Sequence, residues 1–116
     1  MKFKTTQKAI KEGYSDIYAV NYCDACNILA PFEPVAYTAG IYGWNCDVYQ
    51  FGQYAIATGY RTIGDVVPYE LIKALNDDAK TFLELYGNGV ITGDELQYNC
   101  RNLIYKITDA MNAKRQ

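Results

Sequence analysis

Histidine is absent from this chain of 116 residues. Its absence excludes catalytic triads that contain histidine, histidine proton shuttles and histidine-ligated metals. Any acid–base chemistry would need a carboxylate, a tyrosine or a lysine with a strongly shifted pKa. Neither a GxGxxG nor a GxxxxGK pattern occurs, so a nucleotide-binding loop of either type is not expected, and no cofactor is expected.

Long apolar runs are also missing. No window approaches the roughly 18 apolar residues of a membrane span, and the N-terminus has no apolar run of signal-peptide length. We therefore expect a cytoplasmic protein without membrane contact. In that compartment the four cysteines are expected to be reduced thiols.

Basic side chains are scarce between residues 12 and 65, where Arg61 is the only one and six side chains are acidic. The net charge of the chain is −2. Because there is no basic groove or basic run, direct nucleic-acid binding through phosphates is not expected. Mimicry of DNA would need more carboxylates than this segment holds.

The composition is that of an ordinary globular protein, with 50% hydrophobic and 21% charged residues. A chain of this length fits one domain with a core that needs no disulfides or metals. We expect residues 1–116 to form a single domain.

Alternation of apolar and polar residues and the turn residues between them predict several strands. The strands are expected at residues 15–22, 35–41, 46–51, and 54–58 or 54–60. The last three would form an antiparallel meander through turns at residues 42–45 and 52–53.

Helical patterns flank these strands. Short helices are expected at residues 6–12 and 23–29, and a longer helix begins near Pro68 with Asp65 or a neighbour as its cap. Its apolar face would comprise Leu71, Leu75, Ala79 and Phe82, and Gly87 and Gly89 would end it.

The last helix begins at a capping box of Thr92 and Glu95. Its apolar stripe is Leu96, Cys100, Leu103, Ile104, Ile107 and Met111. The predicted fold class is α+β, a short antiparallel meander sheet packed against two C-terminal helices, with a short N-terminal helix.

Tyrosine is the most over-represented residue, with 12 copies, and residues 37–64 combine many of them with only two ionised side chains, Asp47 and Arg61. Tyrosine suits both a packed sheet and a binding surface, because the ring can be buried while the hydroxyl finds a partner. Both interpretations stay open. In a hairpin with its turn near Gly52, Asp47 would lie opposite residue 58, with Arg61 close by. We favour a structural ion pair over a ligand clamp for Asp47 and Arg61.

Cys23 and Cys26 form a CxxC pair where a strand runs into a helix. A helix N-terminus lowers the pKa of a thiol, which suggests a thiol oxidoreductase. Two cysteines on a small helix also occur as core residues. A zinc site would need four ligands, and the other two cysteines, Cys46 and Cys100, lie far away in sequence. Their spacing does not predict a shared site, so no metal is expected.

The segment YGWNCDVY at residues 42–49, followed by TGYR at residues 58–61 and preceded by YCD at residues 22–24, resembles small uncharacterised phage and mobile-element proteins of Gram-positive gut bacteria. The resemblance covers about residues 7–75. No known activity accompanies it. It implies a small acidic phage protein that binds and blocks a host enzyme, such as a restriction or CRISPR nuclease.

We therefore expect a non-enzymatic binding protein, an inhibitor of a bacterial defence system that contacts a bacterial host protein. Tyrosine, tryptophan and arginine dominate interface hot spots. The expected partner-binding residues are Tyr42, Trp44, Asn45, Asp47, Tyr49, Tyr60 and Arg61. Trp44 lies in an expected turn, although a single tryptophan also suits a core. The alternatives are a small-molecule or nucleotide-signal binder and an oxidoreductase using Cys23 and Cys26.

Overall fold

A computed structural model describes residues 16–39, 45–59 and 65–115. Their contacts group into two compact units, each built from two stretches of the chain. The sheet unit comprises Met1–Tyr22 and Pro34–Val67, and the helical unit comprises Cys23–Glu33 and Pro68–Gln116. The helix predicted at residues 6–12 lies outside the described residues.

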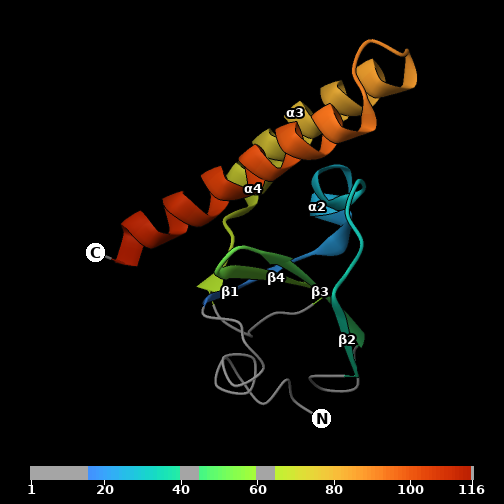
Figure 1. Cartoon of the computed structure of the whole chain (residues 1–116). Coiled ribbons are helices and arrows are strands. Elements are labelled where there is room, and N and C mark those ends of the chain that lie inside the picture. The colour runs from blue at the N-terminus through green and yellow to red at the C-terminus, as the bar shows by residue number, and fades with distance from the viewer. Residues whose placement is uncertain (1–15, 40–44, 60–64, 116) are drawn as a thin grey trace. The chain divides into compact units, whose positions relative to one another are not determined.

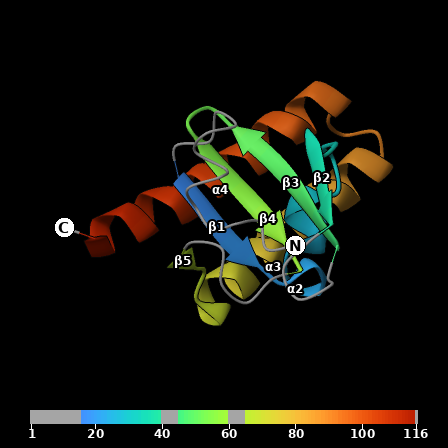
Figure 2. The same cartoon turned by 90° about the horizontal axis from the view of Figure 1, so that it is seen from below.

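The sheet unit contains a five-stranded sheet. Its strands are β1 (Asp16–Val20), β2 (Ala36–Ala39), β3 (Asn45–Phe51), β4 (Tyr54–Thr58) and β5 (Asp65–Val66). Figure 2 shows their spatial order, β2-β3-β4-β1-β5. All four predicted strands are present, and with the helices described below they confirm the α+β class. The β3–β4 hairpin turns at Gly52, whose φ of 58° favours glycine.

β2, β3 and β4 form the predicted antiparallel meander. β1 adds to this meander in a way that the sequence pattern did not indicate, since it pairs in parallel with β4 on one side and with β5 on the other. The sheet is therefore mixed. β5 was missed because two residues are too few to show an alternating pattern.

The central strands β1 and β4 are buried at consecutive positions, Ile17 to Val20 and Ala55 to Thr58. Successive side chains of a strand point to opposite faces, so both faces of the sheet are covered here. Small side chains at Ala19, Ala55 and Ala57 fill the middle of these strands and are fully buried. The rings of Tyr18 and Tyr54 lie 6.2 Å apart at a tilt of 55°.

The helical unit contains α2 (Tyr22–Leu29), α3 (Tyr69–Gly87) and α4 (Gly93–Arg115), although the first residue of α2 belongs to the sheet unit. α3 and α4 lie side by side in Figure 1. α3 begins directly after Pro68, as predicted, but no side chain caps it. The predicted cap Asp65 is wrong, because that residue lies in β5.

The buried face of α3 matches the predicted set of residues only in part. Leu75 and Ala79 are buried, as expected, together with Ile72. Leu71 and Phe82 are half-buried. The helix ends at the predicted glycines, with Gly89 at a φ of +75° that other residues rarely adopt.

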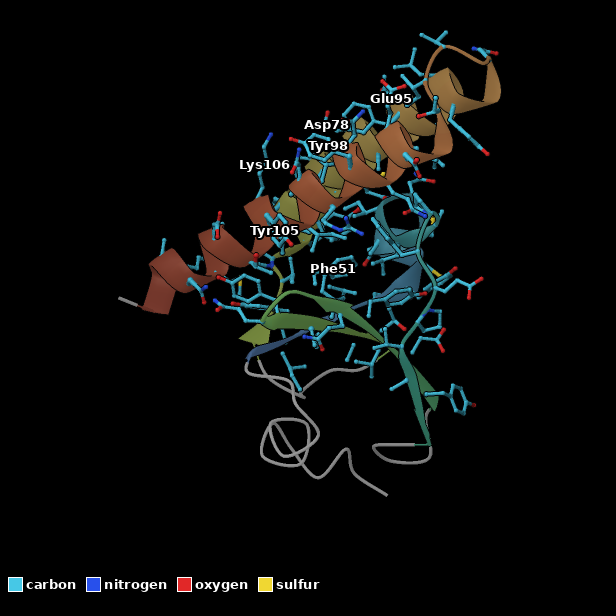
Figure 3. The ribbon with its side chains drawn as sticks, in the orientation of Figure 1. Phe51, Asp78, Glu95, Tyr98, Tyr105 and Lys106 are labelled. Atoms are coloured by element: carbon cyan, nitrogen blue, oxygen red, sulfur yellow. The ribbon has the colours of Figure 1, made fainter. Side chains whose placement is uncertain are left out.

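α4 matches its prediction closely. The Glu95 N–H donates to Thr92 Oγ1 at 3.2 Å, and the Thr92 N–H donates to Glu95 Oε1 at 3.1 Å, which is the predicted capping box. All six residues of the predicted stripe are buried. Glu95, Tyr98, Tyr105 and Lys106 follow one another along the helix, with Asp78 on the neighbouring α3 (Figure 3).

Side-chain bonds join α2 and the segment after it to the long helices. Asn76 Oδ1 on α3 accepts the N–H of Asn27 at 2.8 Å and that of Ile28 at 3.2 Å. Gln97 on α4 donates to the carbonyl of Pro31 at 3.1 Å. These contacts hold residues 27–31 against both long helices of the unit.

Candidate functional site

The residues predicted to bind a partner fall into two groups. Tyr42, Trp44, Tyr60 and Arg61 lie outside the described residues, and so do residues 42–44 of the predicted turn and the Arg61 side of its predicted pair with Asp47. Asn45, Asp47 and Tyr49 lie on β3. The site is therefore built here from β3 and its neighbours.

The register of the β3–β4 hairpin places Asp47 where the sequence predicted it. Val48 pairs with Ala57, so the preceding residue Asp47 lies opposite Thr58. The Thr58 hydroxyl donates to the Asp47 main-chain carbonyl at 3.3 Å. This bond confirms the predicted pairing of Asp47 with residue 58.

On its other side β3 pairs with the edge strand β2, and Tyr37 lies directly opposite Asp47. Directly opposite residues project from the same face of a sheet. Tyr37, Asp47 and Thr58 therefore form a row across three strands, from an exposed tyrosine at the edge to a buried threonine.

The parallel strands bring a second tyrosine to the same end of the sheet. β1 and β4 run in parallel with Val20 opposite Thr58, and the Gly59 N–H donates to the Val20 carbonyl at 2.9 Å. The chain leaves β1 at this end, where Tyr22 is 46% exposed. Sequence reasoning missed Tyr22 as a site residue, because its position depends on the parallel pairing of β1.

Tyr49 links these residues electrostatically. It lies two residues beyond Asp47 on β3, so both side chains are on one face of the sheet. Burial raises the pKa of the Tyr49 phenol, and the nearby Asp47 carboxylate and Tyr22 phenol raise it further. Tyr22, Tyr37, Asp47 and Tyr49 form what we call the tyrosine edge.

The members of the tyrosine edge differ in exposure. Tyr37 is 64% exposed, whereas Tyr49 is 5% exposed. The Tyr49 pKa lies above its ordinary value of 10.0, so the hydroxyl is protonated at neutral pH, as an ordinary phenol is, and can donate a hydrogen bond from within the sheet. The edge thus presents two accessible phenols and a carboxylate, all of which form hydrogen bonds, and the phenol rings can also stack on a partner.

The cysteines predicted as a redox pair lie in the first two turns of α2. Cys23 is exposed and Cys26 is half-buried, and neither is in a disulfide. The Cys26 thiol lies 3.9 Å from Asn27 Oδ1. Cys100 is fully buried in α4, and burial raises its pKa to about 11. Among the residues that the structure describes, no group of three or more cysteine, aspartate or glutamate side chains is placed to hold a metal ion.

Comparison with known proteins adds no relative. No family model, no curated protein and no solved structure matches this chain.

Proposed function

We propose that this protein is a non-enzymatic binding protein and that the tyrosine edge is its contact surface for another protein. The observation that supports this most strongly is the exposure of Tyr22 and Tyr37 beside Asp47, at one end of a sheet whose centre is fully buried. Tyrosine gives a large contact area at low entropic cost and supplies a hydroxyl for hydrogen bonding, which is why it is enriched at interface hot spots.

The resemblance of residues 42–61 to phage and mobile-element proteins supports a more specific version. In it the protein inhibits a bacterial defence system, such as a CRISPR or restriction nuclease, by binding a host protein in the bacterial cytoplasm. In this version Tyr42, Trp44, Tyr60 and Arg61, which were predicted from the sequence, also contact the partner. No helix within the described residues is long and apolar enough to cross a bilayer.

A small-molecule binder is the second candidate. Ligands of open sheets with parallel strands bind beyond the carboxyl ends of those strands, and this is where Tyr22 and Gly59 leave β1 and β4. A planar or anionic metabolite would bind to the tyrosines and raise the melting temperature of the protein, with the logarithm of its concentration once that exceeds the Kd.

The test is a phage-plating assay in bacteria that carry an active CRISPR or restriction system and express this protein. Wild type is compared with Tyr22→Ala/Tyr37→Ala and with the control Tyr86→Ala/Tyr98→Ala. The control removes two tyrosines of similar exposure, 48% and 64%, from the helical unit. Both variants are checked for an unchanged melting temperature.

We expect wild type and the control to restore plating and the tyrosine-edge variant to lose it. Equal plating by all three proteins above the empty vector would remove the tyrosine edge from the function. Plating at the empty-vector level by folded wild type, in hosts that represent each type of defence system, would contradict the inhibitor proposal.

A further inference from the structure

Cys23 and Cys26 lie three residues apart in α2, Cys23 in the first turn and Cys26 at the start of the second. In an α-helix, a separation of three residues places two Cα atoms about 5 Å apart, from a rise of about 1.5 Å per residue and a radius of about 2.3 Å. Disulfides join Cα atoms about 4.4–6.8 Å apart. The pair is therefore spaced for a disulfide without unwinding of the helix.

The two thiols differ in their exposure to solvent, which suits attack by one thiol on an external disulfide and resolution by the other. Cys23 is exposed and can meet an oxidant in solution, whereas Cys26 is half-buried. The fully buried Cys100 serves as an internal comparison, because the same oxidant cannot reach it. Access thus selects Cys23 as the first thiol to react and Cys26 as the one that resolves the product.

The rest of α2 is anchored within the helical unit. The residues directly after Cys26, Asn27 and Ile28, donate their N–H groups to Asn76 on α3. Tyr22 of the tyrosine edge directly precedes Cys23, and both residues are exposed. A covalent link between Cys23 and Cys26 would therefore tie the exposed start of α2 to its anchored part.

We propose that Cys23 and Cys26 form a reversible intrachain disulfide that links the first turn of α2 to the second. Its effect on Tyr22, and so on partner binding, rests on the proposed function, but formation of the disulfide does not. The oxidant is a low-molecular-weight disulfide of the glutathione type.

The chemistry balances in two exchange steps. The Cys23 thiol loses its proton, and its sulfur attacks the small disulfide, which breaks and releases one small thiol that takes up a proton. The Cys26 sulfur then attacks Cys23 in this mixed disulfide and releases the second small thiol with the second proton. Two protein thiols are oxidised and one small disulfide is reduced to two thiols, and excess thiol reverses both steps.

The test equilibrates the native full-length chain with glutathione buffers of increasing oxidised fraction, blocks the remaining thiols with iodoacetamide and maps the peptides by mass spectrometry. We expect a peptide containing both Cys23 and Cys26 that has lost two hydrogens and carries no alkyl group. Its amount should rise with the oxidised fraction and return to zero in reduced glutathione, while Cys100 stays unmodified by glutathione.

Two variants make the order of the steps visible. Cys26→Ser should accumulate glutathione on Cys23, because the resolving thiol is gone. Cys23→Ser should leave Cys26 mostly unmodified. Independent alkylation of Cys23 and Cys26 in wild type at every buffer ratio, or a disulfide from either of them to Cys46, would overturn the proposal. Because this readout needs no partner, it stands or fails separately from the phage-plating assay.

Discussion

The side-chain oxygen of Asn76 on α3 accepts the N–H groups of two successive residues of α2, and the shorter bond joins it to Asn27 at 2.8 Å. One carbonyl thus satisfies two donors that lie 48 and 49 residues away in sequence.

We predict that Asn76→Ala lowers the free energy of unfolding by about 1–3 kcal/mol, because two partly buried N–H groups lose their acceptor. Urea unfolding followed by circular dichroism measures this. Asn76→Asp is the matched control, since its carboxylate keeps an oxygen in place and should retain most of the stability. An alanine variant as stable as wild type would mean that both N–H groups pair again within α2.

The start of α4 should depend on its capping box. Thr92→Ala removes the hydroxyl that accepts the Glu95 N–H, and we expect a loss of about 1 kcal/mol in the free energy of unfolding. Thr92→Ser keeps the acceptor and should stay close to wild type. Thermal or urea unfolding compares the three proteins, and equal losses for serine and alanine would show that the hydroxyl does not stabilise the helix.

Cys100 should make the protein sensitive to alkaline pH. Its pKa is raised from 9.0 to about 11 in the folded state, so the folded protein holds this proton more tightly than the unfolded chain does. Stability is then fully present below the unfolded pKa and falls as the pH rises from about 9 to about 11, by roughly 2–3 kcal/mol.

Urea unfolding at a series of pH values measures this loss. In Cys100→Ala the fall between pH 9 and 11 should be much smaller, because the titrating thiol is gone. Cys23→Ala, which removes an exposed thiol, is the control and should keep the wild-type fall. The same slope in all three proteins would contradict the prediction.

The titration of Tyr49 should reveal the electrostatic interactions within the tyrosine edge. Its pKa lies above the ordinary value of 10.0, chiefly through burial and secondly through the Asp47 carboxylate. Asp47→Asn should therefore lower the Tyr49 pKa without returning it to 10, and Tyr22→Phe should lower it by less. Carbon-13 NMR of labelled tyrosine rings follows the titration.

Asp109→Asn changes a carboxylate of the helical unit and should leave the Tyr49 pKa unchanged. A Tyr49 pKa insensitive to Asp47→Asn would show that the two side chains do not interact as the edge requires. Because the folded protein binds the Tyr49 proton more tightly, this group also favours folding below pH 10 and loses that effect as the pH rises further.

The elements that could be predicted from sequence are those whose signals are local. α4 follows from two residues of a capping box and an apolar stripe, and the β3–β4 pairing follows from a turn at Gly52. The position of β1 between β4 and β5 could not be predicted, because an alternating pattern identifies a strand but not its neighbours.

In the candidate site, too, local relationships could be predicted and long-range ones could not. Asp47 and its pairing with Thr58 belong to a hairpin and were predicted. Tyr37 and Tyr22 were not predicted as site residues. The place of Tyr37 in the site depends on the β2–β3 register, and that of Tyr22 depends on the parallel pairing of β1 with β4. Both are long-range relationships that leave no trace in local spacing.

The split of the helical unit into two stretches of chain also bears on how the protein forms during synthesis. α2 leaves the ribosome before Asn76 and Gln97, which bond to α2 and to Pro31. Until α3 and α4 have followed, Ile28 and Leu29, which are buried in the folded protein, belong to an incomplete helical unit. The nascent chain therefore exposes an apolar segment during part of its synthesis, which makes this segment a target for chaperones.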